Sequence, residues 1–372
     1  MFKRIIEKSL QKRIGSGKAV IITGPRQVGK TTLVKQSLTD RPYLFLDGDD
    51  PKTRAELTNP NTEEIRSLIG ANKIVFIDEA QRIENIGITM KIITDQFKNV
   101  QLIASGSSAF ELTNKLNEPL TGRKWEYKLF PISYEELEKT EGVLNAKKRL
   151  ENLLLYGTYP DVLNNPGDER EVLTNLTESY LFKDLLSYNG IRKAKVLENL
   201  LRALAFQVGN EVSYNELSKL VGVDKNTVAS YIKLLEMSYV VFSLSSFSRN
   251  LRKEIKHNQK IYFYDIGVRN AIIQNFNSLE FRNDIGALWE NFLIAERMKY
   301  NAYNQTYAKS YFWRTVDQQE IDYIEEKDGA LSAFEFKWKP TKKIKTPSSF
   351  VNTYNTTAKL IDSDNYREFI IR

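Results

Sequence analysis

The sequence contains no cysteine and a single histidine, His257, in 372 residues. Disulfides and thiolate zinc sites are therefore excluded, and a histidine-based metal site or catalytic triad is disfavoured. Any bound metal is expected to be a hard cation held by oxygen atoms of carboxylates and hydroxyls.

Long apolar runs are also missing. No stretch approaches the ~18 uninterrupted apolar residues of a membrane span, and the first residues, MFKRIIEKSLQKRIGSG, lack the apolar centre and cleavage site of a signal peptide. We therefore expect a cytoplasmic protein without a membrane partner. The composition, 41% hydrophobic and 27% charged, is typical of a soluble globular chain, and the length suggests two or three domains.

The excess of positive charge is small. Lys and Arg number 54 against 47 Asp and Glu, a formal charge of +7. This balance permits a nucleic-acid partner without requiring one, so the places where charge gathers matter more than its sum.

A phosphate-binding loop follows the apolar run AVIIT. Gly24, Gly29, Lys30 and Thr31 fit the pattern GxxxxGK[ST], and a helical pattern follows them. The loop's N–H groups and the helix N-terminus would surround the phosphates, Lys30 would reach the β- and γ-phosphates, and Thr31 would bind Mg²⁺. The expected nucleotide-binding run is Gly24, Pro25, Arg26, Gln27, Val28, Gly29, Lys30, Thr31 and Thr32.

A second acidic motif stands in KIVFIDEAQ (73–81), where an apolar strand pattern ends in two carboxylates. This is a Walker B pattern, because a buried parallel strand is continuously apolar and its carboxyl end faces the ligand. Asp78 is expected to bind Mg²⁺ through water, and Glu79 to act as general base on the attacking water.

Two weaker candidates follow. The strand pattern QLIASGS (101–107) ends in hydroxyls suited to sensing the γ-phosphate, Ser105 or Ser107, although such residues are also ordinary in turns. Arg123, before a fifth strand pattern, would neutralise γ-phosphate charge in cis or from a neighbouring subunit. The alternative is a surface arginine.

These motifs, in this order, resemble those of prokaryotic AAA-type ATPases whose P-loop core is followed by a C-terminal domain of unknown function. The resemblance rests on GPRQVGKTT, IDEAQRI, ASGSS, LTGRKW with LFPISYEEL, YGTYPDVL, QKIYFYDIGVRN, GALWENFLIAE and FEFKWK, and spans nearly the whole chain. It implies an ATPase with ATP and Mg²⁺ as ligands.

The middle of the chain predicts helices and then a winged helix-turn-helix. Helical spacing runs from Ser133 to about Leu204, and residues 213–241 read as helix, glycine turn and a helix capped by Asp224, followed by two strand patterns. The second helix has no net charge, whereas the wing (249–260) carries +4. The wing is therefore expected to contact DNA, or else to be a solvated hairpin or a subunit-docking surface.

The last quarter has the pattern of the PD-(D/E)xK nuclease fold. In AFEFKW, alternation places Glu335 and Lys337 on one strand face, and Asp322 stands on the preceding strand of a hairpin. The two carboxylates would bind Mg²⁺, Lys337 would orient the attacking water, and Glu290 resembles the acidic residue on the first helix of such folds. Four lysines in WKPTKKIK (338–345) would contact a phosphate backbone.

We thus expect an α/β protein in four parts: a P-loop AAA-type ATPase core with a parallel sheet (1–134), a helical connector (135–204), a winged helix-turn-helix (205–275) and a PD-(D/E)xK nuclease-like α/β domain (276–372). The expected function is ATP hydrolysis with Mg²⁺, coupled to DNA binding and to metal-dependent DNA cleavage. The alternative is a regulatory ATPase whose C-terminal domain only docks DNA or protein. An oligomer is compatible with either function.

Overall fold

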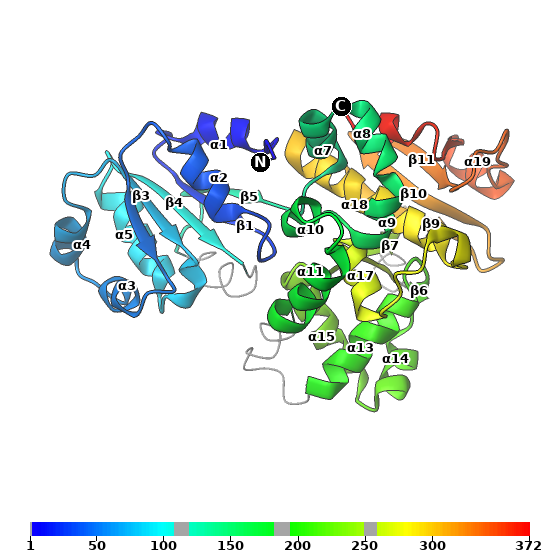
Figure 1. Cartoon of the computed structure of the whole chain (residues 1–372), viewed down its shortest axis with the longest axis horizontal. Coiled ribbons are helices and arrows are strands. Elements are labelled where there is room, and N and C mark those ends of the chain that lie inside the picture. Colours follow the sequence, from blue (N-terminus) through cyan, green and yellow to red (C-terminus); the bar gives the residue numbers. More distant parts are fainter. Residues whose placement is uncertain (1, 108–118, 182–193, 249–258) are drawn as a thin grey trace. The chain divides into compact units, whose positions relative to one another are not determined.

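The chain forms two compact units. A computed structural model describes residues 2–107, 119–181, 194–248 and 259–372 (Figure 1). One unit comprises Met1–Pro131 with Met237–Tyr239, and the other Ile132–Glu236 with Val240–Arg372. We call them the N-terminal and C-terminal units. The expected ATPase core corresponds closely to the first, whereas the other three expected domains share the second.

The N-terminal unit is built on a parallel five-stranded sheet. Its strands β1 and β3 are buried throughout and have the apolar sequences AVIIT and IVFID, as expected for strands covered on both faces. The strand order is β2-β3-β4-β1-β5. The strands are β1 (Ala19–Thr23), β2 (Leu44–Asp47), β3 (Ile74–Asp78), β4 (Gln101–Gly106) and β5 (Lys124–Lys128).

Short helices connect and cover these strands. Apolar side chains from α4 and α5 pack with those of β1, β3 and β4 in one core cluster. The helix α4 begins at a capping box in which Asn61 and Glu64 satisfy each other's backbone N–H groups. The helical elements are α1 (Glu7–Arg13), α2 (Lys30–Ser37), α3 (Pro51–Leu57), α4 (Thr62–Ile69), the 3₁₀ turn η1 (Ala80–Arg82) and α5 (Ile86–Gln96).

The C-terminal unit begins with a group of helices. Among them α14 and α15 are joined by a turn in which Gly222 has φ +70°, and Asp224 accepts the N–H groups of Asn226 and Thr227 at the start of α15. The helices are α7 (Tyr134–Glu141), α8 (Val143–Lys148), α9 (Leu150–Tyr156), α10 (Pro160–Asn164), α11 (Glu169–Asn175), the π-helical η2 (Leu176–Leu181), α13 (Ala194–Phe206), α14 (Tyr214–Val221) and α15 (Lys225–Met237).

Later helices pack around the second sheet. The longest of this later group, α18, is a 20-residue helix with ten buried residues. Within the described ranges, no helix is both long and apolar enough to cross a bilayer. The later helices are α17 (Ile266–Ile272), the 3₁₀ turn η3 (Leu279–Phe281), α18 (Ile285–Asn304), α19 (Ser348–Tyr354) and α20 (Tyr366–Ile370).

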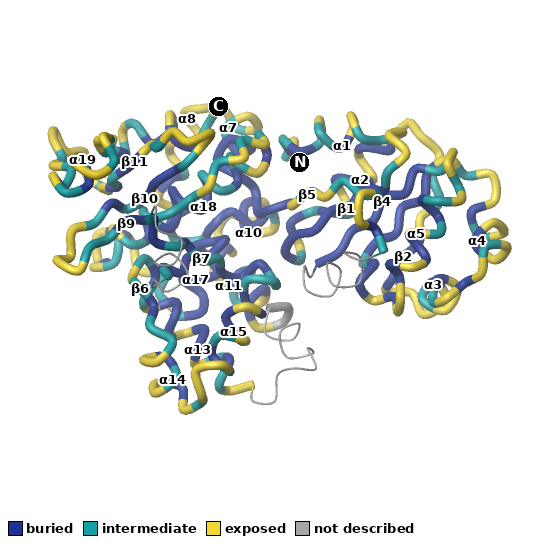
Figure 2. The backbone as a smooth tube through the Cα atoms, turned by 180° about the vertical axis from the view of Figure 1, so that it is seen from behind, coloured by how far each residue is buried: buried dark blue, intermediate teal, exposed yellow. Residues whose placement is uncertain are grey.

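A seven-stranded sheet runs through the C-terminal unit, in the order β12-β11-β10-β9-β7-β8-β6. Parallel pairing of β7 with β9, through Ser245–Tyr311 and Ser246–Phe312, joins the two segments expected to be separate domains. Buried residues, dark blue in Figure 2, lie in the strands β7 and β8 and in the helices α17 and α18. The strands are β6 (Glu211–Val212), β7 (Val241–Ser246), β8 (Gln259–Phe263), β9 (Lys309–Arg314), β10 (Glu320–Lys327), β11 (Ala330–Phe336) and β12 (Ala358–Ile361).

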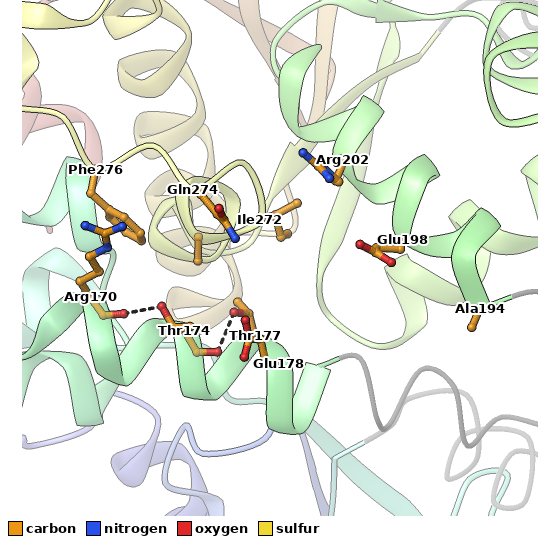
Figure 3. A pocket seen from close by; sticks show the side chains of 11 residues that line it. Arg170, Thr174, Thr177, Glu178, Ala194, Glu198, Arg202, Ile272, Gln274 and Phe276 are labelled. Atoms are coloured by element: carbon orange, nitrogen blue, oxygen red, sulfur yellow. Dashed lines mark hydrogen bonds between the residues drawn. The ribbon is translucent and has the colours of Figure 1, made fainter.

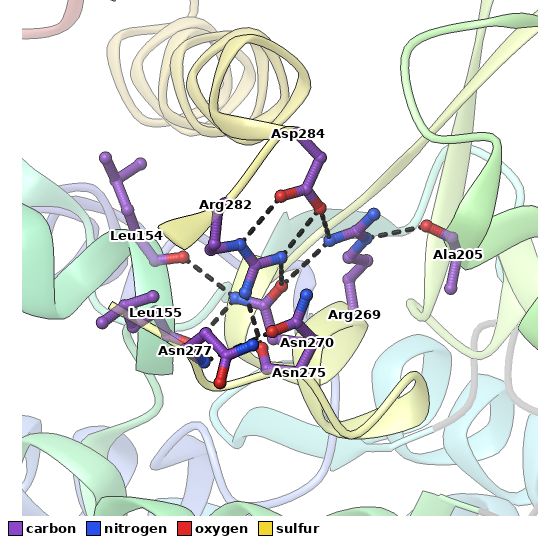
Figure 4. Close-up of polar contacts among 9 residues, drawn as sticks. All are labelled: Leu154, Leu155, Ala205, Arg269, Asn270, Asn275, Asn277, Arg282 and Asp284. Carbon is purple, nitrogen blue, oxygen red and sulfur yellow. Dashed lines mark hydrogen bonds and ion pairs between the residues drawn. The ribbon is translucent and has the colours of Figure 1, made fainter. Parts of the chain in front are cut away.

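A buried polar cluster fastens the loop between α17 and α18 (Figure 4). Asp284 Oδ2 lies 2.6 Å from Arg269 Nη1 and 2.8 Å from Arg282 Nη2. Asn270 donates to the carbonyl of Leu154 at 3.0 Å, which ties α17 to α9. Both guanidinium groups are almost fully buried, so Asp284 provides the charge that permits their burial.

Candidate functional site

The phosphate-binding loop lies at the carboxyl end of β1. Gly24 has φ +153°, and a Cβ there would lie 2.0 Å from the carbonyl oxygen of Leu129, so no larger residue fits. Gly29, at φ +89°, precedes the first residue of α2. These two positions explain why the loop requires glycine.

Two basic side chains donate hydrogen bonds to carbonyls of the loop. The ammonium of Lys30 donates to the carbonyls of Gly24 and Pro25, at 3.0 and 2.7 Å. The buried Arg4 donates to the carbonyl of Val28 in the loop and to that of Phe130, at 2.7 and 2.6 Å. Arg4 is not among the predicted site residues, because nothing in its surrounding sequence distinguishes it from the other basic residues near the N-terminus.

Asp78 meets the loop at the edge of the sheet. Its Oδ2 accepts a hydrogen bond from the Thr31 hydroxyl at 2.6 Å, and its Oδ1 accepts one from Ser105 on β4. The Thr31 hydroxyl and the Asp78 carboxylate are oxygen donors of the kind that Mg²⁺ prefers, and they lie side by side at the loop. The residues therefore fit the expected ion, with Thr31 as a direct ligand and Asp78 acting through water.

Glu79 is held by two neighbours that approach its carboxylate. Gln81 donates to Glu79 Oε2 at 2.5 Å, and Ser107 donates to the same oxygen at 3.2 Å. Gln81 also donates to Ser107 at 3.0 Å, which closes a triangle. Ser107 is predicted from the sequence only as an alternative to Ser105. Gln81 is not among the predicted residues, although it is the last residue of the motif KIVFIDEAQ.

Arg123 lies at the opposite end of the sheet from the loop. Its carbonyl accepts the N–H of Ala19, the first residue of β1, whereas the loop follows Thr23 at the other end. Five strand residues separate the two ends by roughly 16 Å. The Arg123 side chain instead pairs with Asp95 at 2.7 Å. The predicted role in cis is therefore wrong for this arrangement, because β1 and β5 are parallel and Arg123 precedes β5.

The carboxylates predicted for the C-terminal unit lie side by side. Tyr323 pairs with Phe334 across the β10–β11 hairpin, so the next position places Asp322 opposite Glu335. Asp322 Oδ2 accepts the N–H of Phe336 at 2.7 Å, and Lys337 pairs with Glu335 at 2.8 Å.

The burial at the end of β11, from Phe334 to Phe336, alternates as the sequence predicts. Phe334 and Phe336 are buried, whereas the intervening Glu335 is only partly buried. Residues 328–329 form the two-residue turn of the hairpin, both with positive φ, as in a type I′ turn.

Lys260 on β8 contributes an unpredicted positive charge to this group. Its ammonium lies 3.1 Å from Glu290 Oε1 on α18 and also contacts Glu320 on β10. The Tyr262 hydroxyl donates to the same oxygen of Glu290 at 2.6 Å. Lys260 belongs to the segment expected to form the wing (249–260), for which DNA contact, a solvated hairpin and a subunit-docking surface are the alternatives, but its side chain is 2% exposed. A DNA contact by Lys260 is therefore contradicted, because β8 directs this side chain into the unit. Residues 249–258 of the expected wing lie outside the described residues.

The closely spaced charges shift the pKa values of two side chains in this group. Burial, together with the negative charges of Glu290 and Glu335, raises the pKa of Asp322 well above its ordinary value. Burial alone would lower the pKa of Lys260, but its attraction to Glu290 and Glu320 outweighs that effect and raises it. The group therefore combines a carboxyl that resists ionisation with a lysine that stays charged.

A metal ion does not fit this group as it stands. Among the residues that the structure describes, no three acidic or imidazole side chains are placed to hold an ion. Glu290 and Glu320 contact Lys260, and Glu335 contacts Lys337. Each contact takes one oxygen of its carboxylate and places a positive charge beside it, which opposes the binding of the predicted Mg²⁺.

A basic pocket of about 420 Å³ adjoins Glu335 and Lys337. Its lining includes Lys339, Lys343 and Lys345, three of the four lysines predicted to contact phosphates, and no carboxylate except Glu335. The pocket therefore presents positive charge beside Glu335.

A second pocket, of about 520 Å³, lies among α11, η2, α13 and α17 (Figure 3). Arg170 and Arg202 face it together with Glu178 and Glu198, so its charged lining is balanced. It shares no lining residue with the nucleotide site or the carboxylate group.

Comparison with known families and structures identifies the N-terminal fold. Residues 16–138 match the model of an AAA domain, and residues 147–279 and 285–368 each match a model described as a domain of unknown function. A Walker-type ATPase of Pyrococcus abyssi is similar in structure, with a TM-score of 0.53 and 18% identity over 73% of this chain and 96% of that chain. The N-terminal unit thus has the P-loop AAA-type fold, which confirms that part of the resemblance and the α/β class.

Relatives extend over nearly the whole chain. An uncharacterized protein of Mycobacterium tuberculosis is 26% identical over 340 residues, which cover 90% of this chain and 74% of the relative. An uncharacterized protein of Haemophilus influenzae is 23% identical over 381 residues, covering 94% of this chain and 88% of the relative. Both similarities include the C-terminal unit together with the AAA domain.

Proposed function

We propose that the protein binds ATP and hydrolyses it to ADP and phosphate with Mg²⁺. The observation that carries this proposal is the contact between Thr31 of α2 and Asp78 of β3, which are 47 positions apart in the chain. Together they would hold Mg²⁺, which supplies charge neutralisation at the phosphates.

The protein's own residues would bind the phosphates and activate the attacking water. The N–H groups of the loop and the ammonium of Lys30 would bind the phosphates, with Lys30 exchanging its two carbonyl contacts for phosphate oxygens. Glu79 would accept a proton from the attacking water, and Gln81 and Ser107 would orient its carboxylate.

ATP turnover by the purified full chain tests the proposal. We expect Mg²⁺-dependent release of phosphate that is lost on addition of EDTA. Unchanged turnover when Lys30 is replaced by alanine would assign the activity to another site or to a contaminant.

We further propose that the C-terminal unit binds DNA with little sequence preference. Support comes from the pocket lined by Lys339, Lys343 and Lys345, since lysine clusters without acid partners bind phosphate backbones. The helix-turn-helix geometry of α14 and α15 is a second, weaker support. ATP binding would control this surface, and a DNA-dependent change in ATP turnover would test that link.

Metal-dependent DNA cleavage is a second candidate function. It is favoured by the opposition of Asp322 and Glu335 across the hairpin, with Lys337 beside Glu335, and it requires a conformation in which Glu290 and Glu335 release their lysine contacts. The alternative is a C-terminal unit that docks DNA or protein without cutting. Incubation of supercoiled plasmid with the protein and Mg²⁺ or Mn²⁺, with and without ATP, separates the two: nicked product that requires Asp322 supports cleavage, and intact plasmid supports docking.

Arg123 retains a proposed role only between subunits. Its position at the far end of the sheet leaves it available to a neighbouring copy, where it would neutralise γ-phosphate charge. Mixing Arg123→Ala chains with Lys30→Ala chains tests this role, because partial recovery of ATP turnover requires an oligomer in which one subunit completes another.

A further inference from the structure

Lys260 is enclosed by carboxylates from two other elements of the C-terminal unit. Its side chain is 2% exposed, and its ammonium contacts Glu290 on α18 and Glu320 on β10. The ammonium also lies 5.4 Å from the ring centroid of Phe312 on β9. Its charge is therefore balanced by the protein's own acidic groups instead of by water.

One of these acidic groups, Glu290, belongs to the proposed cleavage centre, in which Asp322 and Glu335 would hold the divalent cation. Glu290 contributes one oxygen to both Lys260 and the hydroxyl of Tyr262. Asp322, whose electrostatic neighbours include Glu290 and Lys260, accepts the N–H of Phe336 with Oδ2. A divalent ion entering here would meet the buried ammonium at short range, where little water screens the repulsion.

We infer that Lys260 is an internal counter-ion that takes the place of a divalent cation beside Glu290, Glu320 and Asp322. In this conformation the C-terminal unit then excludes Mg²⁺ and Mn²⁺, and a cleaving state requires Lys260 to leave these carboxylates. The inference rests on the proposed location of the cleavage centre, but it concerns metal uptake and holds whether or not DNA is cut. Since Lys260 belongs to β8, metal uptake is tied to the position of that strand.

The number of Mn²⁺ ions bound per chain tests the inference. Electron paramagnetic resonance measures the free Mn²⁺ in a titration without nucleotide, and the bound ions are the difference from the total. The parent protein is the full-length Asp78→Asn variant, so that the nucleotide site contributes no bound ion. We expect the parent to bind no Mn²⁺ at submillimolar concentration, and Lys260→Met to bind one ion per chain with at least about tenfold higher affinity. Lys260→Arg, which keeps the charge, should behave as the parent does.

The Mn²⁺ ion that the Lys260→Met chain gains should be bound by the same carboxylates that contact Lys260 in the parent. Replacing Glu290 by glutamine in the Lys260→Met chain should remove it. A folded Lys260→Met chain that gains no ion overturns the inference, as does a parent that binds Mn²⁺ and loses it on Asp322→Asn. Should Lys260→Met fail to fold, the parent titration decides alone: no uptake supports the inference, and uptake lost with Asp322→Asn overturns it.

The proposed functions are tested by measurements other than this Mn²⁺ titration. ATP turnover in the chain with Asp78 intact, DNA affinity and plasmid nicking are independent measurements. A protein that hydrolyses no ATP or cuts no DNA leaves the Mn²⁺ result standing, so the two kinds of failure are distinguishable.

Discussion

The side-chain amide of Gln81 lies 2.5 Å from Oε2 of Glu79 and fixes the carboxylate proposed as general base. Glu79 itself has a left-handed backbone, with φ +46°. The strand β3 therefore ends in a sharp turn that places Asp78 and Glu79 at the same edge of the sheet, and Gln81 on the following 3₁₀ turn donates back to Glu79.

Replacement of Glu79 by glutamine should separate binding from hydrolysis. ATP affinity should stay within a few-fold of the parent, whereas kcat should fall by about 10² to 10⁴, because only the proton acceptor is removed. Lys30→Ala should instead lose nucleotide binding. Titration with a fluorescent ATP analogue and steady-state phosphate release measure the two effects, and equal turnover in both variants and the parent would refute the site assignment.

Replacement of Gln81 by alanine should lower kcat by roughly tenfold with little change in KM for ATP, since the amide positions Glu79 and is not expected to touch the phosphates. Gln96→Ala, at an exposed position of α5, is the matched control and should leave kcat unchanged. A rise in KM without a change in kcat would show that Gln81 acts in binding.

Charge reversal in the basic pocket should weaken DNA binding. Lys343→Glu with Lys345→Glu removes two predicted phosphate contacts, so the slope of log affinity against log salt should become shallower by about 2. The control pair, Lys147→Glu with Lys148→Glu, changes net charge equally at exposed positions of α8. Fluorescence anisotropy at several salt concentrations measures the DNA affinity of both double variants. An equal loss of affinity in the two would show that the overall charge, and not the pocket, determines binding.

Glu335→Ala should leave folding nearly intact and abolish cleavage if the second candidate function holds. Glu335 is partly exposed, whereas Phe334 and Phe336 supply the burial of β11, so the melting temperature should change little. Glu326→Ala, on the same hairpin, is the control and should cut plasmid as the parent does. Nicking that survives Glu335→Ala would place the cutting site elsewhere.

The C-terminal unit should lose stability in acid through Asp284. Although partial burial opposes ionisation, the hydrogen bonds from Arg282 and Arg269 lower the pKa of Asp284 to about 2. A depressed pKa in the folded state stabilises the protein above the unfolded value near 3.8, and this contribution, about 2 kcal/mol, is lost as the pH falls towards 2.

The measurement is urea denaturation at several pH values between 2 and 6. Asp284→Asn should lower stability at neutral pH, because it leaves two buried guanidinium groups without their carboxylate. It should also flatten the acid dependence, and an unchanged dependence would assign the acid transition to other carboxyls.

Local sequence determined much of the nucleotide site. Glycine at 24 and 29, the lysine and threonine after them, and an apolar strand ending in Asp78 are each required by backbone geometry or by burial, and these requirements act within a few residues. The hairpin carrying Asp322 and Glu335 was also predictable, since strand alternation and a two-residue Asp-Gly turn fix its register.

Only the tertiary structure decided which distant residues these side chains contact. The order of parallel strands sends Arg123 to the far end of the sheet, and the pairing of β7 with β9 merges two expected domains. The same sheet brings Lys260 between Glu290 and Glu320. Such contacts join residues far apart in sequence, and they are selected by the burial of whole strands and the balancing of buried charge, neither of which leaves a local pattern in the chain.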